Sequence, residues 1–245
     1  MRVFLILCFV ILFFIITLPL DLILIVIGKF NPALKMSICQ CIVRKVFSGI
    51  LHLAGADITV DGLENIPEDK AVLFVGNHQS YFDILVTCIY IKRGVGYVAK
   101  KEMIKIPFLN WWMKGINCLF LDRSNIKEGL KTILQGVEEL KKGNSMFIFP
   151  EGTRHQGDTM LPFKEGSTKM AEKAKAPIIP VAITGTSSLF EKNHALKVTP
   201  AKVHVSFGEP VIAADLEKEE RKFLGAYLQK KIEGMLEEYQ QNASN

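Results

Sequence analysis

The residues of this chain best suited to catalysis are a histidine and an aspartate, His78 and Asp83, with four residues between them. They lie in residues 77–83, which have the sequence NHQSYFD. In one continuous helix their side chains would lie about 140° apart around the axis, because each residue turns by about 100°. They can meet only if the helix begins between them, and Ser80 is a suitable N-cap for that start. Asp83 would then hold one imidazole nitrogen of His78 and leave the other as a general base. The alternative is a loop histidine and an acidic residue that only favours the helix dipole.

A second polar turn, residues 149–154 with the sequence FPEGTR, follows another apolar run. Because the first turn follows the apolar run 71–76, both turns are expected at the carboxyl ends of strands, where active sites of α/β sheets form. The planar guanidinium of Arg154 can bind two phosphate oxygens at once. Glu151 would hold that arginine or bind polar groups of a substrate, and Gly152 would let the backbone approach closely. A purely local ion pair between Glu151 and Arg154 is the structural alternative.

Together, NHxxxxD and FPEGTR resemble the signature of the glycerolipid acyltransferase family, which includes 1-acyl-glycerol-3-phosphate acyltransferases. Both motifs stand here without a departure, and the resemblance covers roughly residues 57–210. It implies that the catalytic pair is His78 and Asp83. It also implies that the FPEGTR turn and the region from Lys100 and Lys101 to Arg123 bind the acceptor. The acceptor-binding positions carried over are Lys101, Arg123, Glu151, Gly152, Thr153 and Arg154.

The reaction that this resemblance implies moves a fatty acyl group from acyl-CoA or acyl-carrier protein to the sn-2 hydroxyl of 1-acyl-glycerol-3-phosphate, giving phosphatidic acid. His78 would take the proton of the hydroxyl while Asp83 holds the ring tautomer, as in a triad without its serine. A covalent acyl-enzyme would need an activated nucleophile, and Ser80 is near, but the chain has no GxSxG elbow. Direct transfer is therefore favoured, with no metal or other cofactor.

Three other functions stay open at this point. The same chemistry could act on glycerol-3-phosphate, another lysophospholipid or a lyso-aminolipid. A thioesterase or lysolipid hydrolase would use water as the acceptor and would have no use for a phosphate-binding arginine. A non-catalytic membrane-binding module would not need the base and its orienting aspartate.

The amino-terminal segment predicts membrane attachment. Residues 3–27 are apolar apart from Asp21, and about 25 helical residues reach some 38 Å, enough to cross the hydrocarbon core. Pro19 and Asp21 predict a kink and a polar interruption. A second helix, residues 36–54, would lie at the bilayer surface or against the first helix with its polar stripe toward water, an ordinary domain helix being the alternative. The stripe consists of Gln40, Arg44, Ser48 and His52.

Charge and composition place the rest of the chain on one side of that membrane. Basic residues follow the first apolar segment while only Arg2 precedes it, so the positive-inside rule predicts a catalytic domain on the cytoplasmic side of the cell membrane. The net charge of +5 suits an anionic surface or a phosphate-bearing substrate. Five scattered cysteines predict neither a disulfide framework nor a metal site, and no nucleic-acid-binding module is present.

From residue 56 onward the pattern is α/β. We expect residues 1–55 to form a two-helix membrane-associated segment and residues 56–245 to form one acyltransferase domain, with a mostly parallel or mixed sheet flanked by helices. Residues 216–239 predict an amphipathic helix that packs on the domain. Polar groups after four of the strands predict one site at a common edge of the sheet. The seven predicted strands are residues 58–60, 72–75, 96–99, 118–121, 146–149, 178–184 and 202–207.

Overall fold

All seven expected strands are present in the computed structural model, which describes residues 1–155, 157, 159–193 and 196–244. They form one sheet in the order β1-β7-β6-β2-β5-β3-β4. The strands are β1 (Ala56–Asp61), β2 (Leu73–Gly76), β3 (Gly96–Lys100), β4 (Leu119–Leu121), β5 (Met146–Ile148), β6 (Ile178–Thr184) and β7 (Ala201–Phe207).

The sheet is mixed. Strands β6, β2, β5, β3 and β4 are parallel to one another. Strand β7 runs antiparallel to β6, and β1 is parallel to β7, so these two run the other way. The carboxyl ends of β2, β5, β3 and β4 therefore meet at one edge of the sheet, as the polar residues after these strands predict.

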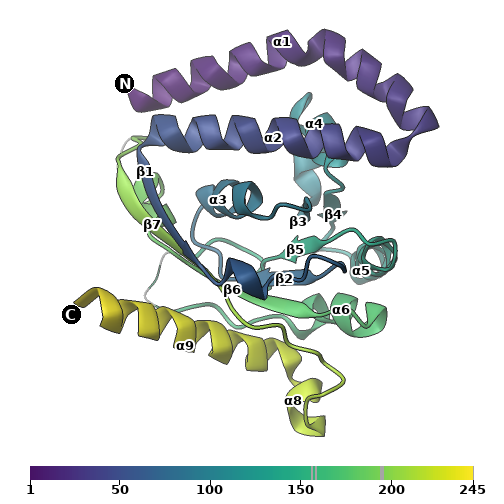
Figure 1. Cartoon of the computed structure of the whole chain (residues 1–245), viewed down its shortest axis with the longest axis vertical. Coiled ribbons are helices and arrows are strands. Elements are labelled where there is room, and N and C mark those ends of the chain that lie inside the picture. Colours follow the sequence, from purple (N-terminus) through teal and green to yellow (C-terminus); the bar gives the residue numbers. More distant parts are fainter. Residues whose placement is uncertain (156, 158, 194–195, 245) are drawn as a thin grey trace.

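Helices cover both faces of the sheet. Successive side chains of a strand point to opposite faces, and here both sets are apolar, so both faces must be covered. On β2, Phe74 joins the core beneath α2 (Pro32–Ala54) and α3 (Phe82–Tyr90), whereas Leu73 and Val75 join the core beneath α5 (Ile126–Lys141), α6 (Lys169–Ala174) and α9 (Leu224–Ser244). Figure 1 shows α3, α2 and α1 stacked outward from one face, with α9 across the other. The shorter helices are α4 (Leu109–Gly115), α7 (Thr186–Leu189), α8 (Lys218–Lys222) and the 3₁₀ helices η1 (Leu63–Asn65), η2 (Lys101–Lys105) and η3 (Glu165–Ser167).

The amino-terminal helices form a hairpin. Helix α1 (Arg2–Phe30) and helix α2 (Pro32–Ala54) meet at Asn31, whose side chain accepts the N–H of Leu34 and caps α2. Both helices are long and apolar enough to cross a membrane. Helix α1, which contains Pro19 and bends along its length in Figure 1, is the outermost layer and exposes most of its apolar side chains.

The polar stripe of α2 does not face water along its whole length, which corrects the sequence prediction. Gln40 is buried, and its amide donates to the carbonyls of Val95 (3.0 Å) and Ile116 (3.4 Å). Arg44 donates to the carbonyl of Lys92 at 2.8 Å. The two carbonyls that Gln40 binds are covered by α2 and therefore need a donor from the protein, whereas the bond of Arg44 lies at the surface. Only the carboxyl-terminal half of the stripe is exposed, and α2 is therefore fastened to the α/β domain.

The carboxyl-terminal segment is two helices rather than the single helix that the sequence predicts. Helices α8 and α9 are separated at Phe223, whose backbone leaves the helical region (φ −114°, ψ 48°). The break turns Phe223 outward, where it is 49% exposed. Leu224, Leu228 and Ile232 of α9 are buried on the sheet, as their spacing predicts.

Candidate active site

The expected histidine–aspartate pair forms where β2 meets α3. Nδ1 of His78 lies 2.8 Å from Oδ2 of Asp83, whose side chain is fully buried. The same oxygen accepts the backbone N–H groups of Gln79 and Ser80, and Oδ1 accepts the hydroxyl of Thr186. Four donors thus fix the carboxylate. They leave Nδ1 of His78 as the proton-bearing nitrogen and Nε2 as the acceptor.

The helix begins between the two residues, but later than predicted. Helix α3 starts at Phe82 with Tyr81 at the N-cap position, while the sequence favours Ser80 there. The side chain of Ser80 still satisfies an open helix donor, since its Oγ accepts the N–H of Phe82 at 3.0 Å. The reason for the shift is that the carboxylate of Asp83 folds back onto the N–H groups of the preceding turn and holds them outside the regular helix.

The FPEGTR turn supports the histidine from the neighbouring strand. Oε1 of Glu151 accepts the backbone N–H of His78 at 2.6 Å, and Oε2 accepts the N–H of Leu161 at 3.0 Å. The ring of Phe149 stacks on the imidazole with centroids 4.1 Å apart. Burial raises the pKa of Glu151, partly offset by these N–H donors. The hypothesis that Glu151 holds Arg154 is wrong: its carboxylate binds the backbone of His78 and Leu161 instead.

The carboxylate that holds Arg154 is Glu191, a residue that the sequence analysis missed. Nη1 of Arg154 lies 3.1 Å from Oε1 of Glu191, and its guanidinium lies 3.6 Å from the centroid of the Tyr81 ring. The same carboxylate accepts the N–H of Tyr81 (2.9 Å) and the hydroxyl of Ser80. Glu191 is 6% exposed at its side chain and joins the NHxxxxD turn to the FPEGTR turn. Nothing in the sequence near Glu191 indicates these partners.

Two further residues, one after β2 and one after β6, position this turn through contacts between the two strand ends. The amide of Asn77, the first residue of the NHxxxxD motif, donates to the carbonyl of Ile183 and accepts its N–H, both at 2.8 Å. This pairing fixes the end of β2 against β6. Thr186, which holds Asp83, follows β6 at the same edge of the sheet. The signal in the sequence that marks Thr186 is the same as at the other strand exits, a polar residue just after a strand.

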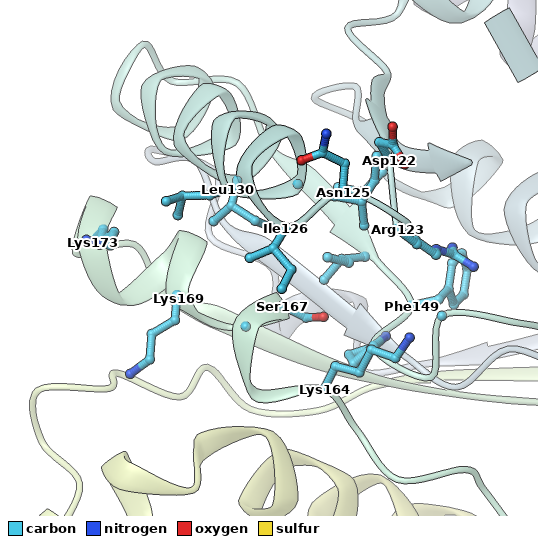
Figure 2. Close-up of a pocket in the computed structure, with 18 residues that line it drawn as sticks. Asp122, Arg123, Asn125, Ile126, Leu130, Phe149, Lys164, Ser167, Lys169 and Lys173 are labelled. Carbon is cyan, nitrogen blue, oxygen red and sulfur yellow. The ribbon is translucent and has the colours of Figure 1, made fainter. Parts of the chain in front are cut away.

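A pocket of about 440 Å³ lies beside the His78–Asp83 pair. Phe149, whose ring stacks on His78, forms part of its wall. Figure 2 shows Arg123, Phe149 and Lys164 at one end and Lys169 and Lys173 at the other. Aliphatic side chains line the middle; they are Val98, Leu121, Ile126, Leu130, Ile133 and Ile148. The pocket thus combines an apolar wall with basic groups.

The remaining predicted acceptor-binding residues surround this site. Arg123 and Lys164 both approach Gly152, which has a φ of +77° that favours glycine. Lys101 lies 2.7 Å from Asp122; this pairing lowers the pKa of the carboxyl and raises that of the amine. Partial burial lowers the pKa of Arg123. The side chain of Thr153 is exposed. In the described part of the chain no cluster of side chains could hold a metal ion.

Comparison with known proteins decides the family. Residues 57–184, just over half of the chain, match the acyltransferase family. The chain belongs to the acyltransferase family. Among its relatives is a 1-acyl-sn-glycerol-3-phosphate acyltransferase of Haemophilus influenzae, 31% identical over 193 residues that cover 76% of this chain and 77% of that protein. An acyltransferase of the same name from Saccharomyces cerevisiae is 36% identical over 66% of this chain and 54% of its own length.

A solved acyltransferase has the same fold. The crystal structure of the 1-acyl-sn-glycerophosphate acyltransferase PlsC from Thermotoga maritima superposes with a TM-score of 0.72 at 29% identity, and the match covers 92% of this chain and 97% of that one. The match spans little more than half of several curated relatives, 54% of the yeast and 57% of the Borreliella burgdorferi acyltransferase.

Proposed function

We propose that this protein transfers a fatty acyl group from a thioester to the sn-2 hydroxyl of 1-acyl-glycerol-3-phosphate, giving phosphatidic acid. The observation that carries the proposal is the buried carboxylate of Asp83, which holds Nδ1 of His78 and leaves Nε2 free at the sheet edge. The names of the related acyltransferases support the acceptor.

The proposed reaction is a direct transfer. Nε2 of His78 takes the proton of the acceptor hydroxyl as its oxygen bonds to the thioester carbonyl carbon. The tetrahedral intermediate then collapses, the carbon–sulfur bond breaks, and the imidazolium returns the proton to the leaving thiolate. The buried carboxylate of Asp83 stabilises the imidazolium between these steps.

The geometry also speaks against an acyl-serine intermediate. Ser80 is fully buried, its hydroxyl donates to Glu191, and its oxygen accepts the N–H of Phe82. It is therefore engaged in holding the turn together, whereas a nucleophile must reach the thioester carbon and give its proton to the base.

Acceptor binding is assigned to the basic groups around the FPEGTR turn. Arg154 is held in place by Glu191 and Tyr81, so its remaining N–H groups are preorganised for phosphate oxygens. Lys101, Arg123, Gly152 and Thr153 are proposed to complete the acceptor site, and Glu151 to act through His78. The apolar pocket beside Phe149 suits a fatty acyl chain. Acyl-CoA and acyl-carrier protein are the candidate donors, and no cofactor is proposed.

Residues 1–55 are proposed to anchor the catalytic domain, residues 56–245, to the cytoplasmic side of the cell membrane. Helix α1 lies along α2, and α2 is hydrogen bonded to the domain through Gln40 and Arg44. If α1 stood perpendicular to the membrane plane, α2 and the domain bound to it would have to enter the hydrocarbon core as well. An α1 that lies in one leaflet, parallel to the surface, keeps the domain in water.

The test is the release of free thiol from acyl-CoA by the purified protein in detergent, with lysophosphatidic acid, with glycerol-3-phosphate and without acceptor. Release that requires lysophosphatidic acid and falls about 10²–10⁴-fold in His78→Ala supports the proposal. His52→Ala, at an exposed histidine of α2, is the matched control and should keep full activity. Release without any acceptor would instead indicate a thioesterase. A protein inactive with acyl-CoA is assayed with acyl-carrier protein, and inactivity there too refutes the transferase.

A further inference from the structure

Residues 104–111, between β3 and the middle of α4, expose large apolar side chains close together in sequence. Their exposed fractions are 39% for Ile104, 44% for Ile106, 37% for Phe108 and 47% for Trp111. Four exposed large apolar residues within eight positions exceed the scattered single residues that are normal on protein surfaces. The proposed reaction does not use any of them.

This segment is continuous with the exposed apolar surface of α1. The ring of Phe108 lies 6.2 Å from that of Phe14, and the ring of Trp112 lies 5.0 Å from that of Phe13. Figure 1 accordingly places α4 beside the α1–α2 hairpin. Phe108 has a φ of +60°, which is rare for an aromatic residue and marks a sharp turn at this contact. Contacts with α1 therefore bring residues 104–111 to the membrane-facing side.

The charges next to the segment suit a lipid headgroup layer. Lys105 and Lys114 are exposed and form no ion pair with any described residue. Exposed tryptophan and basic side chains beside apolar ones are typical of surfaces that lie at the membrane–water interface.

We propose that residues 104–111 insert into the interfacial region of the bilayer as a second membrane contact beside α1. The partner is a lipid surface, argued from continuity with α1 and from the basic residues. The inference rests on the proposed membrane attachment of α1. The insertion would also serve the proposed reaction. Lys101, a proposed acceptor-binding residue, is the first residue of η2 and lies three positions before Ile104, so insertion of residues 104–111 would bring Lys101 to the level of the lipid headgroups.

The two tryptophans permit a direct test. Trp112 is 4% exposed and Trp111 is 47% exposed, so Trp112→Phe leaves a single fluorophore inside the segment. This variant is bound to vesicles of phosphatidylcholine and phosphatidylglycerol with bromine on the acyl chains near the headgroups. The matched control is the triple variant Trp111→Phe, Trp112→Phe, Phe223→Trp, whose fluorophore lies at the exposed α8–α9 junction across the sheet from α1.

We expect the emission of the Trp112→Phe variant to shift to shorter wavelength on vesicle binding and to be quenched at least twofold by the brominated lipid. The position-223 control should co-sediment with vesicles and keep its emission. Bound protein with unquenched Trp111 would overturn the second contact and leave the attachment of α1 intact. A shift without bromine quenching would show that protein, such as a second copy of the chain, covers the segment. Failure to bind vesicles would overturn both proposals.

Discussion

Replacing Glu191 by glutamine is the most informative single change in this site. The substitution keeps the size of the side chain and one acceptor oxygen for Tyr81 and Arg154, and it removes the negative charge that faces Arg154 at 3.1 Å. The oxygen that accepts from Ser80 is replaced by an NH2 group, which the hydroxyl of Ser80 can accept from after rotating. If Glu191 preorganises Arg154 for the acceptor phosphate, the loss should appear as weaker acceptor binding, with little change in the chemical step at His78.

The magnitude follows from the change in hydrogen-bond type. Glu191→Gln turns an ion pair into a hydrogen bond between the charged guanidinium and a neutral amide oxygen, so only the attraction between the two charges is lost. An ion pair open to solvent contributes about 0.2–1 kcal/mol. The side chain of Arg154 is 33% exposed but that of Glu191 only 6%, so we take the upper end of this range. About 1 kcal/mol corresponds to roughly a fivefold higher KM for the acceptor. Glu191→Ala should also lower kcat, since it leaves the buried hydroxyl of Ser80 without its acceptor.

The assay is thiol release at varied lysophosphatidic acid, combined with a double-mutant cycle against Arg154→Ala. In the Arg154→Ala background, Glu191→Gln should change KM less than about twofold, because its effect requires the arginine. Glu209→Gln, at an exposed carboxylate after β7, is the control and should match the unmodified protein. An unchanged KM in Glu191→Gln, or the same fivefold rise with and without Arg154, would refute the reasoning.

Three further changes test other parts of the site and the fold. Thr186→Val removes one donor from the buried carboxylate of Asp83, and we expect kcat to fall about tenfold at a nearly constant KM, measured by thiol release. Gly152→Ala places a Cβ 2.9 Å from Nζ of Lys164 at a φ of +77°; it should lower the melting temperature by about 2–8 °C in detergent, for a cost of about 1–2 kcal/mol, and raise the acceptor KM. His204 is buried and its pKa is lowered by burial, so its neutral form stabilises the fold above its unfolded pKa of about 6.5, and this contribution is lost as the pH falls. The melting temperature should therefore drop more between about pH 7 and pH 5 in the unmodified protein than in His204→Gln; equal drops would contradict this account.

The contact between His78 and Asp83 and the positions of the strands were predictable because their determinants are local. Apolar runs between turn residues locate all seven strands, and the spacing of His78 and Asp83 requires a helix start between them. The parallel exits of β2, β5, β3 and β4 follow from alternating strands and helices. The sequence does not decide between a mostly parallel and a mixed sheet, because the antiparallel direction of β7 depends on how it pairs with β6.

The contacts of the NHxxxxD turn were not predictable, because the partners are distant in sequence and act through single side chains; the pattern of polar residues after strands marks the position of Thr186 but not its contact with Asp83. Glu191 lies 111 residues from Ser80, and Thr186 lies 103 residues from Asp83. Neither belongs to a motif with a characteristic spacing. The sequence predicts that Gln40 faces water for a related reason: a polar residue on a helix has the same sequence pattern whether it meets solvent or the carbonyl of a neighbouring loop. Only the tertiary structure distinguishes these cases.

The hydrogen bonds from Gln40 and Arg44 of α2 to the loops of the α/β domain have a consequence for the proposed reaction at a membrane. They hold the α1–α2 hairpin in one position on the domain, so with α1 in the bilayer, as proposed, the site would stand at a constant height above the lipid. The molecule can still diffuse in the membrane plane and rotate about the membrane normal. Its search for a lipid acceptor is then two-dimensional and depends on the surface density of that lipid, while a water-soluble donor arrives from three dimensions.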